Sequence, residues 1–294
     1  MNILLNKNIQ FIIENYPAHG ATHCATCLNI SLVEIKSKIK YLRRKIGLKL
    51  LPKIYKQEIS KGQQKKYNSQ YAINPELFYN IKNPSVAYLL GLIWADGYVY
   101  TTNKQNKISI EMIATDLIEL IPIFMSIGKW TICQRTRKNK SQQLCISTSN
   151  KPLTNFLITH DYTSKNNASA DKILSHIPKN LHHYWFRGLV DGDGCFYINN
   201  KRKCYQVSIS SSFDQNWNYI ETLFQTLDIP LYVVRRKQLQ QQKTNKSSYI
   251  RITNKSDIIK FGKYIYNGYN NDHMGLSRKY KKFQNIYTND VQQI

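Results

Sequence analysis

Two stretches of the sequence have the apolar pattern of a buried helix that runs directly into an acidic residue and a glycine. They read YLLGLIWADG, which ends at Gly97, and WFRGLVDGDG, which ends at Gly194. A second apolar helical pattern follows each of them, at 115–128 and at 213–229, and a third follows later in each copy. The period of about 100 residues indicates a duplicated domain rather than an array of short repeats.

Between these helices, apolar and polar residues alternate with a period of two, which is typical of half-buried strands. The residues predicted to face the core are Val99, Thr101, Ile108, Ile110, Met112, Trp130, Ile132, Leu144 and Ile146 in the first copy, and Phe196, Ile198, Val207, Ile209, Tyr232, Val234, Ile250 and Ile252 in the second. Each copy is therefore predicted to contain a helix, two strands, a helix, two strands and a helix. We expect an α+β protein with two pseudo-symmetric αββαββα repeats, at 74–180 and 181–294.

The charge of the chain narrows the choice of partner. It contains 42 Lys and Arg against 18 Asp and Glu, which gives a net charge of +24. All parts of the chain carry an excess of bases, and these bases do not follow one amphipathic helix, as a membrane-surface segment would require. A polyanion is the expected partner, and nucleic acid is favoured over a membrane.

The second face of the predicted strands is polar, basic and aromatic. An ordinary solvated face is the alternative interpretation, because antiparallel sheets commonly have one. Acids are almost absent there, Glu111 being the exception, and the side chains are of the kinds that bond base edges and phosphates. The residues expected to contact DNA are Tyr98, Tyr100, Arg135, Arg137, Gln143, Tyr197, Asn199, Lys201, Gln206, Ser208, Arg235, Lys237 and Arg251.

Residues 1–49 have the pattern of three short helices. Ser31 and Glu34 form an S-x-x-E capping box at the start of the third helix, which has a predicted buried stripe of Ile35, Ile39, Leu42 and Ile46. The segment resembles a helix-turn-helix module with 31–46 as the recognition helix. A small basic helical bundle without base specificity is the alternative. The outward residues expected to contact DNA are Lys36, Lys40, Arg43 and Arg44.

Residues 50–73 are polar, rich in lysine and glutamine, and short of periodic apolar residues. We interpret them as a basic linker that tethers the N-terminal module to the repeats and raises overall affinity through effective concentration.

The carboxylates of Asp96 and Asp193 stand where the two apolar helices end. The partial negative charge of a helix C-terminus disfavours a carboxylate there, so stability alone does not explain the repetition. Gly91 and Gly188 lie five residues earlier and would let the two helices approach closely. Two adjacent anions then raise each other's pKa unless a cation lies between them, which favours a divalent metal held by carboxylate and phosphate oxygens. The alternative is an exposed helix end with Gly97 and Gly194 as left-handed caps.

The motifs LLGLIWADG (89–97) and FRGLVDGDG (186–194) resemble the two LAGLIDADG motifs of single-chain homing endonucleases, over about residues 74–288. The resemblance implies two saddle-shaped sheets in the DNA major groove and a double-strand break with short 3′ overhangs. It also implies that Asp96 and Asp193 hold Mg²⁺ (or Mn²⁺), helped by the carbonyl groups of Ala95 and Gly192. A lysine late in each half would complete the catalytic set, here Lys165 and Lys279.

Two positions depart from the motif pattern. Trp94 replaces the usual first Asp of the first motif, which is not the principal metal ligand in the family, so we expect it to be tolerated. Arg187 stands where the second motif more often has a small residue, and it is expected to loosen the helix pair slightly.

Three functional classes follow: a site-specific DNA endonuclease, an RNA-binding intron maturase on the same scaffold, and a non-catalytic DNA-binding regulator. Retention of both carboxylates favours the endonuclease, with a long and asymmetric site in double-stranded DNA. We expect a monomer in an intracellular compartment, because the N-terminus lacks the pattern of a secretion signal and the six cysteines are scattered. No apolar run is long enough to span a membrane.

Overall fold

The computed structural model describes residues 7–46, 73–102, 105–135, 142–199, 201–202, 204–240 and 243–291. Arg137, the side chain of Lys237 and the expected linker except for Ile73 lie outside this description. Ile73, the last residue of the expected linker, is buried in the core of the first repeat. Within the described ranges, no helix has the length and apolar character needed to cross a membrane.

The N-terminal module consists of α1 (Lys7–Leu28) and α2 (Leu32–Ile46). Gly20 interrupts α1 with a φ of 80°, and Asn29 has a φ of 51° in the turn before α2. The module therefore has three helical segments, as the sequence predicts. The Oγ atom of Ser31 accepts a hydrogen bond from the Glu34 N–H at 3.2 Å and caps α2. The module has its own core, made of Ile12, Tyr16, Cys24, Ile35, Ile39 and Leu42.

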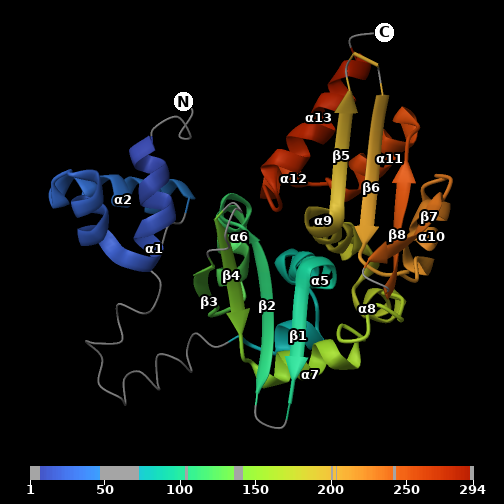
Figure 1. Ribbon diagram of the computed structural model, residues 1–294, viewed down its shortest axis with the longest axis horizontal. Coiled ribbons are helices and arrows are strands. Elements are labelled where there is room, and N and C mark those ends of the chain that lie inside the picture. Colours follow the sequence, from blue (N-terminus) through green and yellow to red (C-terminus); the bar gives the residue numbers. More distant parts are fainter. Residues whose placement is uncertain are drawn as a thin grey trace.

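The first repeat has the predicted order of elements (Figure 1). It contains α4 (Glu76–Tyr79), α5 (Pro84–Asp96), β1 (Gly97–Thr101), β2 (Asn106–Ile113), α6 (Ala114–Ser126), β3 (Thr131–Arg135), β4 (Gln143–Thr148), α7 (Lys151–Thr159) and α8 (Asp171–His176). The strands form an antiparallel sheet in the order β1-β2-β4-β3.

The second repeat follows the same plan. It contains η3 (Lys179–Leu181), α9 (His182–Asp193), β5 (Gly194–Asn199), β6 (Cys204–Ser211), α10 (Asn218–Thr226), β7 (Val233–Gln240), β8 (Lys243–Ile252), α11 (Lys255–Ile265), α12 (Tyr269–Asp272) and α13 (Ser277–Val291). Its sheet has the order β5-β6-β8-β7, which matches the first strand for strand. The predicted α+β fold of two αββαββα repeats is confirmed.

Asparagine begins the equivalent helices of the two repeats. Asn150 accepts a hydrogen bond from the Leu153 N–H at the start of α7, and Asn254 accepts one from the Ser256 N–H at the start of α11, both at 2.9 Å. Asparagine is a favoured N-cap because its side-chain oxygen satisfies a backbone donor that has no partner within the helix. The repeated Asn-Lys pair in the sequence is thus a helix start.

Helices α5 and α9 pack side by side between the two sheets (Figure 1). A Cβ atom on Gly91 would lie 1.9 Å from the carbonyl oxygen of Trp185, and one on Gly188 would lie 2.1 Å from that of Tyr88. The two backbones are therefore in direct contact at both glycines, as the motif spacing predicts. This contact joins the two repeats through one hydrophobic core.

The replacement of Asp by Trp94 is explained by a second aromatic residue across the helix pair. Trp94 packs on Trp185, with ring centroids 6.3 Å apart, and edge-on against Tyr162 at 5.0 Å. At the pseudo-symmetric positions, Tyr88 of α5 donates a hydrogen bond to Asp191 of α9 at 2.8 Å. The helix pair thus has an aromatic contact at one of the two related places and a hydrogen bond at the other, and both are buried.

Arg187 is fully buried. The sequence predicted that it would loosen the helix pair slightly, and this prediction is wrong, because the two helices are in backbone contact. Its side chain leaves α9 away from α5 and donates to the carbonyl oxygens of Ile265 at 2.7 Å, Asn267 at 2.6 Å and Met274 at 2.9 Å. It also forms an ion pair with Asp272 at 3.1 Å. Because its polar atoms meet backbone acceptors, Arg187 fastens the segment after α11 to α9.

The predicted face of β7 is wrong. In the sheet, Val233 lies opposite Ile250 and therefore shares the core-facing side, whereas Val234 lies opposite Tyr249 on the polar side. Tyr232 precedes the strand and is exposed. Two adjacent valines fit either alternation, and a shift of one residue moves every side chain to the other face. Thr101, at the end of its strand, is also exposed rather than in the core.

Candidate active site

The carboxylates of Asp96 and Asp193 lie at the adjoining C-terminal ends of α5 and α9. A Cβ atom on Gly192 would lie 2.4 Å from the Cβ of Ala95 and 3.1 Å from an Oδ atom of Asp96. The small residue before each carboxylate thus allows the two helix ends to meet. Asp193 is half-buried, and Asp96 retains an exposed surface.

The glycine after each carboxylate is not a left-handed helix cap. Gly97 has φ −73° and ψ 137°, and Gly194 has φ −86° and ψ 148°, so both have extended backbone and begin a strand. Glycine is required there because a Cβ atom would lie 2.3 Å from the Ile93 oxygen or 2.5 Å from the Val190 oxygen. The alternative interpretation of Gly97 and Gly194 as left-handed caps is therefore wrong.

Lys165, in the segment between α7 and α8, reaches the end of α5. Its Nζ atom donates to the carbonyl oxygens of Trp94 at 2.7 Å, Ala95 at 2.9 Å and Gly97 at 3.0 Å. A cation at a helix C-terminus satisfies the last carbonyl groups and opposes their partial negative charge.

Lys279, near the start of α13, binds the end of α9 in the same way. Its Nζ atom donates to the oxygens of Val190 and Asp191 at 2.7 Å and of Gly194 at 2.6 Å, with a longer contact to Gly192 at 3.4 Å. Its side chain is buried, with 4% of the residue exposed. The two lysines predicted from the resemblance therefore both lie beside the carboxylates. Lys165 comes from the first repeat and Lys279 from the second, and each binds the helix end of its own repeat.

The four charged groups strongly affect one another. The pKa of Asp193 is raised to about 7: burial is the largest cause, the nearby Asp96 also raises it, and Lys165 and Lys279 oppose the rise. Burial also raises the pKa of Asp96, while the same two lysines lower it. Burial lowers the pKa of both lysines, against the attraction of the carboxylates. The centre therefore holds two carboxylates that do not ionise together easily without a further cation.

This coupling predicts a pH dependence of folding. The folded pKa of Asp193, about 7, lies above the value of roughly 3.9 in an unfolded chain. A raised carboxyl pKa means that stability is fully present at low pH and is lost as pH rises through the folded pKa. In EDTA, we expect the free energy of unfolding to fall by about 1 kcal/mol between pH 6 and pH 8.

Denaturant titration of wild type and Asp193→Asn at both pH values checks this prediction. Asp193→Asn should lose the fall, while the matched control Asp228→Asn, at an exposed carboxylate of another region, should keep it. Mg²⁺ should restore stability at pH 8 in the wild type. An identical pH profile for Asp193→Asn and wild type would contradict the assignment.

The donors at the centre fit a divalent metal ion. They are two carboxylates and the carbonyl oxygens of Ala95 and Gly192, which are hard oxygen ligands of the kind that Mg²⁺ and Mn²⁺ prefer. The Ala95 oxygen also accepts from Lys165, but a carbonyl oxygen has two lone pairs. The described residues contain no group of three His, Cys, Asp or Glu side chains that could hold a metal, so this centre has only two carboxylates to offer.

The polar faces of the sheets collect most of the residues expected to contact DNA. Strand register places Tyr98 and Tyr100 of β1 on the same face as Ser109, and Tyr197 of β5 on the same face as Gln206. The rings of Tyr98 and Tyr100 stack with centroids 6.1 Å apart and are exposed. The other expected residues on these faces are Arg135, Gln143, Asn199, Ser208 and Arg251, and Lys201 lies in the turn beyond β5.

Arg235 is not on that face. It lies opposite Ser248, on the side of the sheet that carries Val233, and forms an ion pair with Asp214 at 2.9 Å. The reason is that the core-facing residues of β7 are shifted by one position from the predicted alternation. On the first sheet, Lys107 lies opposite Tyr100 and joins the polar face, although the sequence reasoning missed it. The period-two alternation of Lys107, Ser109 and Glu111 could have identified it.

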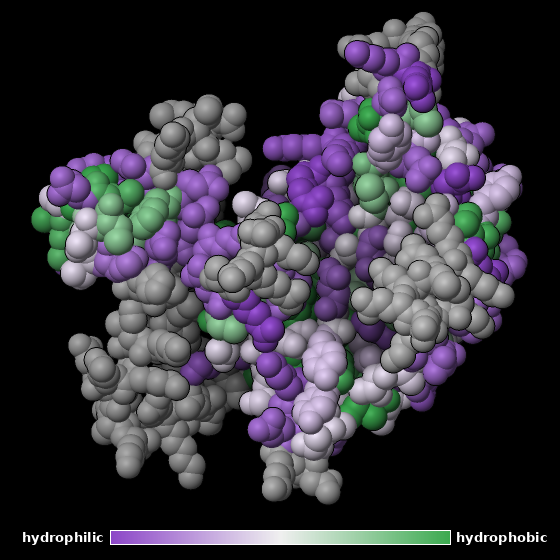
Figure 2. All heavy atoms as spheres, in the orientation of Figure 1, coloured by the Kyte–Doolittle hydropathy of each residue, from purple (hydrophilic) through white to green (hydrophobic). Residues whose placement is uncertain are grey.

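Hydrophilic residues predominate on the described surface that Figure 2 shows, and apolar residues appear there in small groups. Arg135 forms an ion pair with Glu111 at 3.2 Å within the first sheet face, so the one acid of this face is partly neutralised. The face therefore remains suited to an anionic partner.

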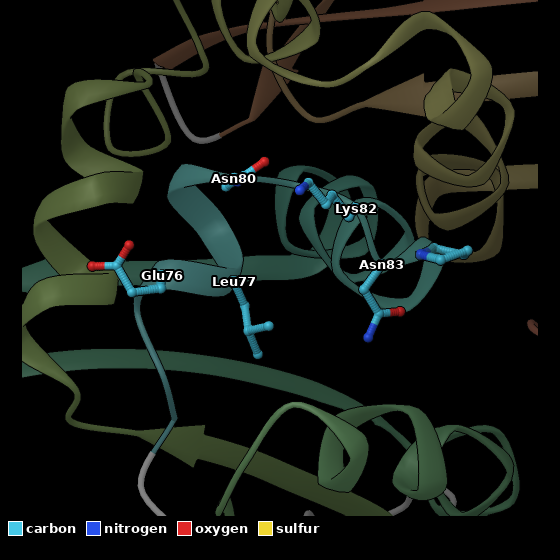
Figure 3. A pocket seen from close by; sticks show the side chains of 6 residues that line it. Glu76, Leu77, Asn80, Lys82 and Asn83 are labelled. Carbon is cyan, nitrogen blue, oxygen red and sulfur yellow. The ribbon is translucent and has the colours of Figure 1, made fainter.

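A separate hollow lies between α4 and the start of α5 (Figure 3). It is lined by Glu76, Leu77, Asn80, Lys82, Asn83 and Pro84. None of these residues was predicted to act in catalysis or DNA contact, and Asn83 is occupied as the N-cap of α5. The hollow shares no residue with the candidate active site.

Fold and site together define a two-repeat α+β protein with a shared acidic centre on a pseudo-twofold axis. Residues 181–266, from η3 through α11, match the model of the LAGLIDADG-like domain. The match covers most of the second repeat and includes its motif, so the resemblance of that motif to the LAGLIDADG motif is confirmed. A search of curated proteins found no match to the chain.

Several solved structures have a similar arrangement. The homing endonuclease I-WcaI bound to its DNA recognition sequence is 19% identical, with 71% of this chain and 87% of that chain covered and a TM-score of 0.43. A variant of I-DmoI in complex with its target DNA is 17% identical, with 64% and 97% covered and a TM-score of 0.43. Full-length DUF199/WhiA from Thermatoga maritima is 18% identical, with 74% and 65% covered and a TM-score of 0.41.

Proposed function

We propose that the protein is a site-specific endonuclease that hydrolyses both strands of duplex DNA with a divalent metal ion. The observation that carries this proposal is the pair of carboxylates, Asp96 and Asp193, at the ends of two helices in backbone contact. Their position between two polar sheet faces suits a phosphodiester on each strand. The net charge of +24 supports a nucleic-acid partner.

Asp96, Asp193 and the carbonyl oxygens of Ala95 and Gly192 would hold the metal ion. When bound, it would lower the pKa of a water molecule and stabilise negative charge on the phosphate. Lys165 and Lys279 hold the helix ends in place and place two positive charges beside the carboxylates. In the proposed reaction these charges also offset the charge that develops on the phosphate oxygens.

The test is cleavage of a randomised duplex DNA library in Mg²⁺ and in EDTA, followed by sequencing of the ends. Metal-dependent ends at one long site, absent from the double variant Asp96→Asn/Asp193→Asn, are the expected result. Tight binding to structured RNA without any cleavage would support an intron maturase instead. Tight binding to DNA without cleavage would support a regulator.

We also propose that the N-terminal module binds duplex DNA through α2. Ile35, Ile39 and Leu42 are buried, which turns the opposite side of the helix to solvent, where Lys36, Lys40 and Arg44 are exposed. The first residues of a recognition helix commonly contact base edges. The exposed apolar side chain of Val33, at 79%, stands there and would fit against a thymine methyl group. Arg43 instead donates to the hydroxyl of Tyr16 at the side of the module.

Removal of residues 1–66 should weaken DNA binding and make it less dependent on salt. In the full chain, Lys36→Ala/Lys40→Ala/Arg44→Ala should reduce the slope of log affinity against log salt by about 2 to 3, because each lost phosphate contact lowers it by about 0.9. Fluorescence anisotropy at several salt concentrations measures this slope. Lys281→Ala/Lys282→Ala, two exposed lysines of α13, is the matched control. Equal slopes for the triple variant and wild type would refute the DNA-binding role of α2.

A further inference from the structure

The first turn of α13 in the second repeat is held by two acids of α6 in the first. The backbone N–H of Ser277 donates to an Oε atom of Glu119 at 3.1 Å. The Nε atom of Arg278 donates to both carboxylate oxygens of Asp116, at 2.8 and 3.0 Å, and an Nη atom donates to one of them as well. The Asp116 carboxylate is buried, and its hydrogen bonds raise the pKa of Arg278.

The residue that follows this contact is Lys279. The N–H of Leu276 donates to the Asp191 carboxylate at 2.9 Å, so every residue from 276 to 279 is attached to a different acceptor. Because helix geometry fixes the spacing of consecutive residues, movement of Arg278 would move Lys279 as well. The contact with α6 therefore holds the first turn of α13, from which Lys279 reaches the carbonyl oxygens at the end of α9.

Among the residues that the structure describes, no equivalent contact ties the segment of Lys165 to an acid of the other repeat. Lys165 lies in a segment of turns rather than at the start of a long helix. Asp214, which corresponds to Asp116 with an offset of 98, pairs with Arg235 of its own repeat instead. A hollow is found next to it, lined among others by Asn166, Asn167, Trp217 and Glu221.

We propose that Asp116 and Glu119 are positioning residues for Lys279, and that cleavage at the half-site next to Lys279 depends on the first repeat through them. The half-site next to Lys165 does not depend on this contact. The inference rests on the proposed nuclease function. It predicts that loss of the contact separates the two strand cleavages in time.

The experiment uses a supercoiled plasmid with the target site and saturating protein under single-turnover conditions. Asp116→Asn/Glu119→Gln should cut one strand at the wild-type rate and the other roughly 10- to 100-fold more slowly, because small misplacements of catalytic groups have effects of this size. Nicked circles should accumulate, and end sequencing should assign the slow strand. DNA affinity should stay unchanged. The matched control Asp228→Asn disrupts an exposed ion pair with Lys260, 3.2 Å long, and should behave as wild type.

A second variant guards against failure of the first to fold. Arg278→Lys keeps the charge but loses the bidentate geometry, so it should show the same strand bias to a smaller degree. If the variants cut both strands more slowly to the same degree, or cut both at the wild-type rate, the inference would be overturned. The proposed nuclease function would still stand if the wild type cleaves the target.

A measurement that does not depend on catalysis tests the positioning role of Asp116 and Glu119 separately from the proposed nuclease function. Brief treatment with an amine-acylating reagent, followed by peptide mass spectrometry, reports the exposure of each lysine. Lys279 should be protected in the wild type and become reactive in Asp116→Asn/Glu119→Gln, while Lys165 keeps its wild-type reactivity. Unchanged protection of Lys279 in that variant would contradict the positioning role even if the wild type proves to have no nuclease activity.

Discussion

Asp96→Asn and Asp193→Asn are each expected to reduce double-strand cleavage by roughly 10³-fold or more, since each removes a charged ligand from the proposed metal centre, which would supply most of the charge stabilisation. Asparagine keeps the size and the hydrogen-bonding oxygen of the side chain but cannot carry the negative charge. The two carboxylates lie at the ends of helices that meet at Gly192, so either change affects both half-sites.

The measurement is the cleavage rate of the identified target in Mg²⁺, with the affinity measured in Ca²⁺ or EDTA on the same DNA. Binding should be retained or slightly tightened, because each variant removes one negative charge next to the phosphates. Folding should be retained as well, and Asp193→Asn should lose the pH-dependent fall in stability described above. Wild-type cleavage by either variant would exclude the carboxylates as the metal-binding centre.

Gly91→Ala and Gly188→Ala are expected to destabilise the protein by more than about 4 kcal/mol, which is exceptional for the addition of one methyl group. In an open helix, the same substitution would stabilise by roughly 1 kcal/mol. Here the new Cβ atom would lie 1.9 or 2.1 Å from a backbone oxygen of the facing helix. Because the obstacle is backbone, the two helices would have to separate, and both carboxylates would move with them.

Thermal or denaturant unfolding of the two variants tests this expectation. Thr222→Ala, on the exposed side of α10, is the matched control and should stay within about 0.5 kcal/mol of wild type. If a variant is too unstable to purify, its soluble yield beside that of Thr222→Ala gives the direction of the effect. Wild-type stability of Gly91→Ala would show that the helices do not approach as closely as described.

Much of the architecture could be predicted from local patterns. The duplication, the order of elements in each repeat and the N-terminal helices follow from apolar periodicity and capping residues, which act over a few neighbouring positions. The candidate centre could also be predicted, because the motif that contains Gly91 and Asp96 occurs a second time as Gly188 and Asp193. A motif of this kind encodes both the close helix approach and the chemistry.

Other features depend on contacts that no local pattern specifies. The prediction of which β7 residues face the core was wrong, because Val233 and Val234 are both suited to a core. Only the pairing of β7 with β8 decides between them. Arg187 was expected to disturb the helix pair, yet the carbonyl groups after α11 accept its donors and make its burial favourable. Trp94 is accommodated by Trp185 of the other half rather than by anything near it in sequence.

The sequence by itself determined the repeats, their helices and strands, and the two carboxylates, because each of these depends on the spacing of residues within one element. Only the tertiary structure decided which charges meet. Arg278 and Asp116 are 162 positions apart, and Lys279 reaches carbonyl oxygens of a helix 88 positions before it. Whether such groups pair depends on the path of the backbone between them and on the burial that makes an unpaired charge costly.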